Sequence, residues 1–233
     1  MGRRTGRPRA GQEVLTRERI LDTALRVVDA DGLGALTMRR LADELGVDPM
    51  AIYRHLPGKQ ALVAALVGRA FSDLRLPAAA GRPWQDRVRA FAAAYRALAR
   101  AHPNLVLQIV TDAAAASAAA LEASEELYAA LEAAGLPPSS IVRANNLIVD
   151  YLNGFALAEA SAADTRTVDL EEQLADPDER SETPAPTMRR VLAQVPSTDL
   201  DSSFAFGLDT ILLGLEAIAT RERNPQRDEA LNA

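Results

Sequence analysis

The sequence predicts an all-α protein, in which a small N-terminal domain of three helices precedes a larger helical domain. Apolar residues recur at helical spacing along most of the 233 residues, and we find no segment with the alternation typical of a strand. Glycines, prolines and cap residues divide the chain into segments of helical length. With 48% apolar residues, such helices can bury a sizeable core.

Residues 1–15 form a basic arm before the first predicted helix. Arg3, Arg4, Arg7 and Arg9 lie there among glycines and a proline, without apolar periodicity. Such an arm is either a solubilising tail or a segment that follows phosphates or enters a minor groove, as homeodomain arms do. Its position just before the motif described below favours a contact with DNA.

The first predicted helix runs from Thr16 to Asp31. The Thr16 hydroxyl can cap its start, and Gly32 follows its end. Its apolar face carries Ile20, Ala24, Val27 and Val28. We expect this face to be the floor on which two shorter helices pack.

Residues 37–59 predict two short helices joined by a tight turn. Thr37 can cap the first helix, and Gly46 stands where that helix must stop, because glycine tolerates the left-handed conformation. Asp48 can cap the second helix, and Pro49 takes its first position, where the missing N–H costs nothing. Pro57–Gly58 ends this helix after about two turns. This is the helix-turn-helix arrangement, whose second helix enters the DNA major groove.

The same pattern also fits an ordinary helical hairpin buried in a bundle. Against that alternative, the short second helix presents Tyr53, Arg54 and His55 outward. A helix of two turns buries little, so three such side chains look costly for a purely structural hairpin. They are useful if phosphates and base edges lie opposite.

Lys59 begins a longer predicted helix that runs to about Leu74. An ammonium group at the N-terminal end of a helix opposes the helix dipole, so structural preference alone does not explain this lysine, whereas a phosphate contact does. The predicted DNA contacts are Thr37, Arg39, Pro49, Met50, Ala51, Tyr53, Arg54, His55 and Lys59.

We therefore predict a helix-turn-helix DNA-binding domain with its connecting helix over residues 16–75, and a helical ligand-binding and dimerisation domain over residues 82–223. The turn residues Gly81–Pro83 mark the break between them. The second domain is expected to contain helices at 84–101, 105–116, 121–134, 138–160, 188–195 and 204–221. Residues 161–186 are acidic, polar and dotted with proline, so we expect a flexible acidic loop there.

Charge is distributed unevenly along the chain. The net charge is −6, yet residues 1–60 contain 11 Lys/Arg against 8 Asp/Glu, while the remainder contains 15 against 24. A basic head on an acidic body indicates an end that contacts DNA, attached to a part with another task.

Composition excludes several kinds of chemistry. There is no cysteine, hence no disulfide, thiolate nucleophile or Cys-based zinc site, and two distant histidines make a His-rich metal site equally unexpected. We find no catalytic set, no phosphate loop and no dinucleotide glycine pattern, so we expect no enzyme, no cofactor and no metal. No apolar run approaches the roughly 20 residues needed to span a bilayer, and no signal peptide is evident, so we expect a cytoplasmic protein without a membrane partner.

A polar line in the predicted helix 138–160 marks a candidate ligand site. Asn146, Asp150 and Asn153 fall at i, i+4 and i+7 among hydrophobic neighbours. They are either a solvated face or a few polar groups in an apolar cavity; the hydrophobic neighbours favour the cavity. The candidate ligand-binding residues are Phe91, Tyr95, Leu98, His102, Leu105, Gln108, Ile109, Leu127, Asn146, Asp150 and Asn153.

Glycines in the last predicted helix mark a candidate contact between helices. Gly207 and Gly214 lie seven residues apart, and a glycine inside a helix costs about 1 kcal/mol relative to alanine, which close approach of another helix can offset. That helix belongs either to the same chain or to a second copy, with which it could form a four-helix bundle. The candidate dimer residues are Gly154, Gly207, Ile211, Gly214, Leu215 and Ile218.

Three segments, ILDTALRVVDADG, LTMRRLADELGV and MAIYRHLPGKQALV, resemble the tetracycline-repressor (TetR) family of bacterial regulators over about residues 14–65. More weakly, WQDRVRAFAAAYRALARAHP and FAFGLDTILLGLEA resemble the family's C-terminal domain. The resemblance implies an all-α homodimer that leaves its operator when a small molecule binds. Members that bind tetracycline hold a metal–drug chelate partly through a histidine in the helix matching 104–113. This chain has Leu107-Gln108-Ile109 there, so we expect no metal-chelated tetracycline.

Taken together, the sequence predicts a homodimeric repressor that binds a pseudo-palindromic double-stranded DNA operator and is released by a small, mostly hydrophobic effector. The alternative is a helical small-molecule sensor or activator whose basic head serves another partner.

Overall fold

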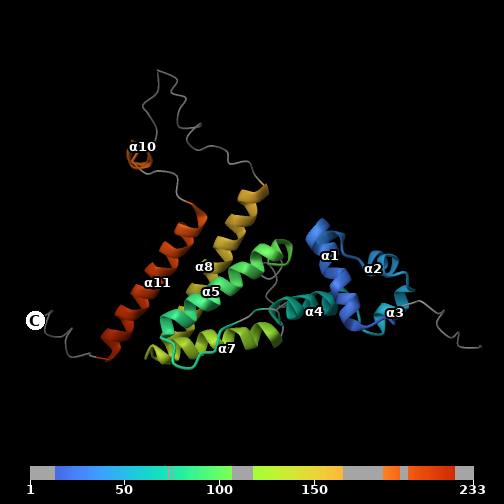
Figure 1. Cartoon of the computed structure of the whole chain (residues 1–233), viewed down its shortest axis with the longest axis horizontal. Helices are drawn as coiled ribbons and strands as arrows, with labels where there is room; N and C mark the ends of the chain where they lie inside the picture. Colours follow the sequence, from blue (N-terminus) through green and yellow to red (C-terminus); the bar gives the residue numbers. More distant parts are fainter. Residues whose placement is uncertain are drawn as a thin grey trace, which may run out of the picture.

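A computed structural model gives the structure of the protein and describes residues 14–72, 74, 76–106, 118–164, 186–194 and 199–223. The regular secondary structure of these residues is helical, with no strand among them, which confirms the predicted all-α class (Figure 1). In chain order the helices are α1 (Arg17–Ala35), α2 (Met38–Leu45), α3 (Pro49–Tyr53), α4 (Lys59–Ser72), α5 (Trp84–Ala101), α7 (Ala118–Ala133), α8 (Pro138–Asp164), α10 (Pro186–Leu192) and α11 (Leu200–Arg223).

The first three helices start at side-chain caps. Thr16 and Thr37 each accept a hydrogen bond from the backbone N–H three residues on, at 3.2 and 3.1 Å. Asp48 accepts the backbone N–H two residues on at 2.8 Å, with Pro49 at the first position of α3. Gly46 ends α2 in the left-handed conformation, at φ 65°. These local signals, which the sequence showed directly, fix the turn between α2 and α3.

Two boundaries near this turn differ from the prediction. α1 continues past its expected end to Ala35, because the chain resumes helical turns after a non-helical break at Gly32, where φ is 76°. α3 is shorter than two turns and ends at Tyr53. Arg54 and His55 therefore lie in the turn that leads into α4, directly after α3.

One buried cluster runs from the N-terminal helices into the body. α1 packs against α2 and α4, and α2 packs against α3. α4 also packs against α7, so it joins the two halves of the molecule (Figure 1). The fully buried side chains of the N-terminal helices and the loop before α2 include Ile20, Leu36, Leu41, Ile52, Leu62 and Leu66.

The body is built on α5, α7 and α8, which pack against one another, while α11 lies along α8 (Figure 1). Its fully buried side chains include Leu105, Leu127, Leu131 and Ile148. Of the helix expected at 105–116, residues 105 and 106 belong to a helical turn over 103–106, and 107–116 lie outside the described residues. α8 extends to Asp164, beyond the expected end, and most of the predicted acidic loop, like the basic arm up to residue 13, lies outside the described residues.

α11 is long and apolar enough, by length and composition, to cross a bilayer. An 18-residue window in it has a mean hydropathy of 1.4, and 28% of this window is buried. The expectation that no apolar stretch approaches spanning length therefore does not hold for α11. Since the helix lies along α8 in an all-helical body, its exposed apolar side chains also suit a contact with another helix.

Candidate DNA interface and effector cavity

α3 is anchored by one buried side chain and turns most of the others outward. Ile52 is fully buried, while Met50 is 66% and Tyr53 43% exposed. Pro49 and Ala51 are half-buried, and Arg54 and His55 in the following turn are exposed. The short helix is thus held by Ile52, and with the following turn it presents three aromatic or cationic groups (Tyr53, Arg54 and His55) and the flexible apolar Met50 to a partner.

Three further predicted contacts lie at the starts of the flanking helices. Arg39 is exposed in the first turn of α2, and the hydroxyl of the exposed Thr37 is used as that helix's cap. Lys59 is exposed at the start of α4, and its Nζ donates to the backbone oxygen of Leu33 at 3.3 Å. This bond supplies a structural reason for Lys59 that the sequence did not reveal. An ammonium has three donors, so a phosphate contact stays compatible with it.

The hydrophobic residues predicted to line an effector site are buried together in the body. Phe91, Tyr95, Leu98, Leu105 and Leu127 all belong to the main core cluster. The Tyr95 hydroxyl donates to Asn153 Oδ1, which links α5 to α8, and burial raises the pKa of Tyr95 to about 12. Two other candidates, Gln108 and Ile109, lie outside the described residues.

Asn146 and Asp150 are exposed, so the structure does not bring them to this core. The inward stripe of α8 includes Ile141, Ala144, Ile148 and Leu152. Asn146 instead shares the outer side with the half-exposed Leu147. The neighbouring Asn145 was missed; its Oδ1 is buried and has no hydrogen-bond partner. Assigning the helical period from the buried stripe rather than from the polar residues would have pointed to Asn145.

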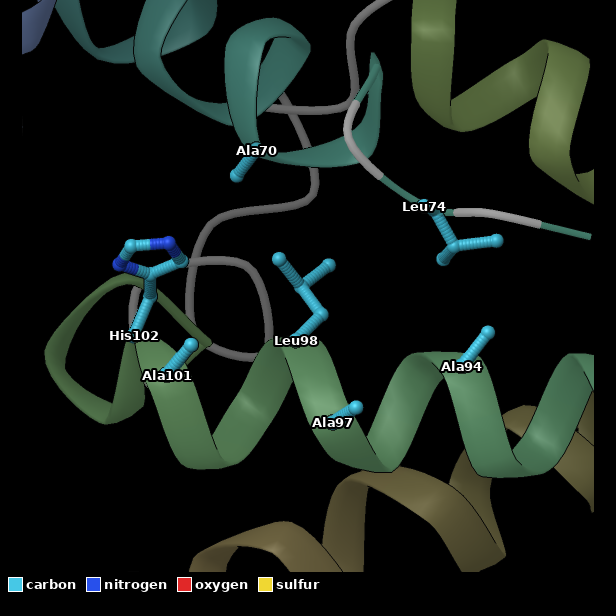
Figure 2. Close-up of a pocket in the computed structure, with 7 residues that line it drawn as sticks. All are labelled: Ala70, Leu74, Ala94, Ala97, Leu98, Ala101 and His102. Atoms are coloured by element: carbon cyan, nitrogen blue, oxygen red, sulfur yellow. The ribbon is translucent and has the colours of Figure 1, made fainter.

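A cavity of about 340 Å³ lies between α4 and α5 (Figure 2). Its lining residues are Ala70, Leu74, Ala94, Ala97, Leu98, Ala101 and His102. Two of them, Leu98 and His102, were predicted to bind a ligand, although the predicted site lay between α5 and the helices that follow it rather than between α4 and α5. His102 Nδ1 lies 3.0 Å from each carboxylate oxygen of Asp29 in α1.

The sequence did not single out a polar cluster that joins three helices of the body. Arg96 in α5 pairs with Glu159 in α8 at 2.6 Å and with Asp201 in α11 at 2.8 Å, and Arg100 pairs with both carboxylates at 2.9 Å. The Arg96 guanidinium carbon also lies 4.4 Å from the ring centre of Phe204. A smaller cavity of about 140 Å³ adjoins Arg100 and Glu159. Both carboxylates of the cluster pair with both guanidinium groups. We therefore interpret the cluster as a structural contact that holds α11 to α5 and α8.

The predicted dimer residues fall into two groups. Leu215 is buried and Ile211 half-buried against the core of the same chain, and a Cβ added at Gly207 would lie 2.5 Å from the Tyr151 hydroxyl of α8. These three positions therefore serve packing within the chain. Gly154, Gly214 and Ile218 are exposed, and a Cβ at either glycine would meet no atom within 4 Å.

Large apolar side chains, Ile218 among them, are exposed on the same two helices. They are Val142 and Leu147 on α8 and Phe206, Leu213 and Ile218 on α11. An exposed apolar surface on two adjacent long helices is typical of a protein–protein interface.

A helix-turn-helix whose second helix is exposed, joined to a helical body, is the architecture of a DNA-binding transcriptional regulator. The family "Bacterial regulatory proteins, tetR family" matches residues 20–66, and "Tetracyclin repressor-like, C-terminal domain" matches residues 76–219. The chain belongs to the TetR family.

Similar proteins and solved structures agree with this family assignment. The HTH-type transcriptional repressor DrrR1 of Streptomyces coeruleorubidus is 32% identical, over 94% of this chain and 84% of that protein. ActR of Streptomyces coelicolor, solved in complex with actinorhodin, is 25% identical with a TM-score of 0.76, over 89% of this chain and 99% of ActR. BioQ, solved with its double-stranded DNA operator, is 25% identical with a TM-score of 0.65, over 88% of this chain and 99% of BioQ.

Proposed function

We propose that this protein is a cytoplasmic, non-enzymatic repressor that binds a pseudo-palindromic operator as a homodimer and leaves it when a mostly apolar small molecule binds. Residues 16–75 would form the DNA-binding domain and residues 82–223 the ligand-binding and dimerisation domain. The observation that carries the proposal is α3, a five-residue helix held by buried Ile52 and followed by exposed Arg54 and His55.

On DNA, each exposed group of this surface has a role that its chemistry suits. Arg54 can reach a guanine edge with two hydrogen bonds, and Met50 can lie against a thymine methyl. Arg39 and Lys59, at the starts of α2 and α4, can neutralise phosphates on either side of the groove. Tyr53, the last residue of α3, is 43% exposed and can lie against the sugar–phosphate backbone.

The homodimer is supported by the apolar residues that α8 and α11 leave exposed. Phe206 and Leu213, at i and i+7 on α11, are 76% and 67% exposed. Burying them against the same face of a second copy is a two-fold arrangement. It would place two recognition helices on two half-sites about 34–36 Å apart.

Release by a small molecule is supported by the apolar cavity and by the likeness to ActR, whose solved complex contains actinorhodin. The cavity borders α4, which packs against α1 on one side and α7 on the other. A ligand changes the DNA affinity only if it binds one arrangement of α4 more tightly than another. A 100-fold loss of DNA affinity needs about 2.7 kcal/mol of coupling, inside the usual range.

The proposal is tested by selecting DNA fragments retained by the purified full chain and comparing two variants on the enriched sequence. Arg54→Ala should change the preferred base at its contact, since a bidentate arginine–guanine pair is worth about 1–3 kcal/mol of discrimination. Lys59→Ala should weaken all sequences by a similar factor. If no sequence is enriched, or if both variants keep the wild-type affinity and preference, the proposed DNA interface is wrong.

A further inference from the structure

The cavity between α4 and α5 has an apolar wall with one imidazole at its end. Its volume of about 340 Å³ lies in the range of small-molecule pockets. Apart from His102, its lining side chains are those of alanine and leucine. Figure 2 shows the His102 ring rising from the end of α5 toward Ala70 of α4. Such a wall favours a hydrophobic molecule, and a single polar group at one end can fix its orientation.

The contact with Asp29 decides which nitrogen of His102 can accept a hydrogen bond. Nδ1 lies 3.0 Å from both oxygens of the Asp29 carboxylate. An ionised carboxylate only accepts, so Nδ1 must carry the hydrogen. In the neutral imidazole Nε2 is then an acceptor, and one ring nitrogen lies on the Ala70 side of the ring in Figure 2.

The same contact ties the cavity wall to the DNA-binding half of the molecule. Asp29 belongs to α1, which packs against both α2 and α4. Asn104, two residues after His102, donates from Nδ2 to the backbone oxygen of Val28 at 3.0 Å. The end of α5 is thus bonded to the last turns of α1, while Ala70 of α4 and Leu74, just after α4, line the cavity. A molecule in the cavity touches two connections between body and head.

We propose that this cavity binds an apolar molecule with a hydroxyl group whose O–H donates to Nε2 of His102, and that Asp29 holds the imidazole in the accepting tautomer. This inference rests on the proposed function, because it assigns the site and the chemistry of the effector. Asp29 is a positioning residue, since it reaches the ligand only through His102. An ether of the same shape has no hydrogen to donate. Its oxygen and Nε2 are both acceptors, so no hydrogen bond forms between them and both stay unsatisfied.

2-Naphthol and 2-methoxynaphthalene are a matched probe pair, because both are naphthalenes with one oxygen and only the first can donate. We expect the full-length protein to bind 2-naphthol at least ten times more tightly than the ether in calorimetric titrations. In His102→Leu the two probes should bind with similar affinity, because Nε2 is gone. In Ala94→Phe both should bind at least ten times more weakly, because the phenyl group fills the cavity.

Asp29→Asn tests the positioning role by the ratio of the two affinities. The ratio should fall toward one while the ether binds as in the wild type, because an amide can donate to Nδ1 as well as accept from it. Asp31→Asn is the matched control: this residue lies two positions on and pairs with Arg40 instead, so the ratio should not change. Thermal unfolding of each variant shows whether it folds. If a variant does not fold, the comparison of the two probes on the wild type still tests the proposal.

The site is refuted if 2-naphthol does not saturate the wild type, if both probes bind it equally, or if the preference survives in His102→Leu. DNA retention is measured on the same preparations. A protein that retains its operator but shows no naphthol preference refutes the site alone. One that shows the preference but retains no DNA refutes the proposed function and leaves the cavity chemistry standing.

Discussion

Arg96 and Glu159 fasten α5 to α8 through an ion pair that the protein almost encloses. Each side chain is only 10% exposed, and the guanidinium donates twice to the carboxylate, at 2.9 and 2.6 Å. The hydrogen bond from Arg96 holds the pKa of the Glu159 carboxyl below its usual value of 4.5. Burial opposes this effect but does not outweigh it.

Glu159→Gln should lower the free energy of unfolding at pH 7 by about 3 kcal/mol, because it removes the buried charged partner of Arg96 and leaves only Asp201, whose side chain is 75% exposed. The pKa of Glu159 is lowered in the folded state, so the carboxylate's contribution is complete above about pH 4.5 and is lost as the pH falls through the lower folded-state pKa. Urea denaturation of both proteins from pH 7 downward should show the gap between them closing in that acidic range.

Asp209→Asn is the matched control, because Asp209 pairs with Arg89 between α5 and α11 with both side chains about half exposed. An exposed pair of this kind contributes about 0–1 kcal/mol, so the control should lose little. Equal losses in the two variants, or a gap that stays constant with pH, would contradict the role given to Glu159.

At the scale of single residues, the sequence predicts those features that depend only on neighbouring residues in the chain. The caps at Thr37 and Asp48 were predicted because a cap needs only the next two or three residues. Asn146 was chosen over Asn145 because the inward side of α8 depends on helices that pack on it from elsewhere in the chain. Arg96 was not singled out, since its partner lies 63 residues away.

Among the elements, α8 and α11 approach each other closely at Gly207. The Tyr151 ring of α8 occupies the place of the missing side chain, and its hydroxyl donates to the backbone oxygen of Phe204 at 2.8 Å. The tyrosine is therefore held where a Cβ at Gly207 would lie 2.5 Å from its oxygen. The glycine predicted to mark a helix contact does mark one, and the contact is within the chain.

Gly207→Ala should destabilise the protein by about 1–3 kcal/mol, the usual cost of overpacking a filled site. Gly34→Ala, in α1, is the control: an added Cβ there meets no atom within 4 Å, so helix propensity should stabilise it by up to about 1 kcal/mol. Thermal unfolding measures both. The cost at Gly207 should be smaller in a Tyr151→Leu background; an equal cost there would mean that Tyr151 is not the obstacle.

Helix identity was predictable at this scale, and helix ends were less so. α4 and α5 start where proline and glycine place them, at Lys59 and Trp84. The end of α1 was missed because three residues after Gly32 return to helical geometry. The end of α3 was missed because a five-residue helix is held by the tertiary contact of Ile52, which no local signal reports.

In the whole molecule, α8 and α11 leave an apolar surface that one chain does not cover. Phe206→Asp and Leu213→Asp should each convert a dimer of about twice 24.9 kDa into a monomer of 24.9 kDa in light scattering, because each would bury a carboxylate at the interface. Leu121→Asp on α7 is a control of similar exposure, 68%, that should keep the dimer. A monomeric wild type at micromolar concentration, or loss of the dimer in Leu121→Asp alone, would place the interface elsewhere.

The general plan of the molecule, a basic head on an acidic helical body, could be predicted from charge distribution and the helix-turn-helix pattern. The cavity between α4 and α5 could not, because its lining residues come from two helices and the residues just after them, and include four small alanines that show no pattern of their own. The link from His102 to Asp29 spans 73 residues and is likewise a product of tertiary packing.

The central claim, that two copies of this head neutralise phosphates around one operator, is tested most directly by the salt dependence of operator affinity. We expect log affinity to fall linearly with log salt concentration, and each lost phosphate contact to reduce the slope by about 0.9. A dimeric Lys59→Ala variant should therefore show a slope smaller by about 1.8 than the wild type. An affinity that does not change with salt, or a Lys59→Ala slope equal to that of the wild type, would contradict it.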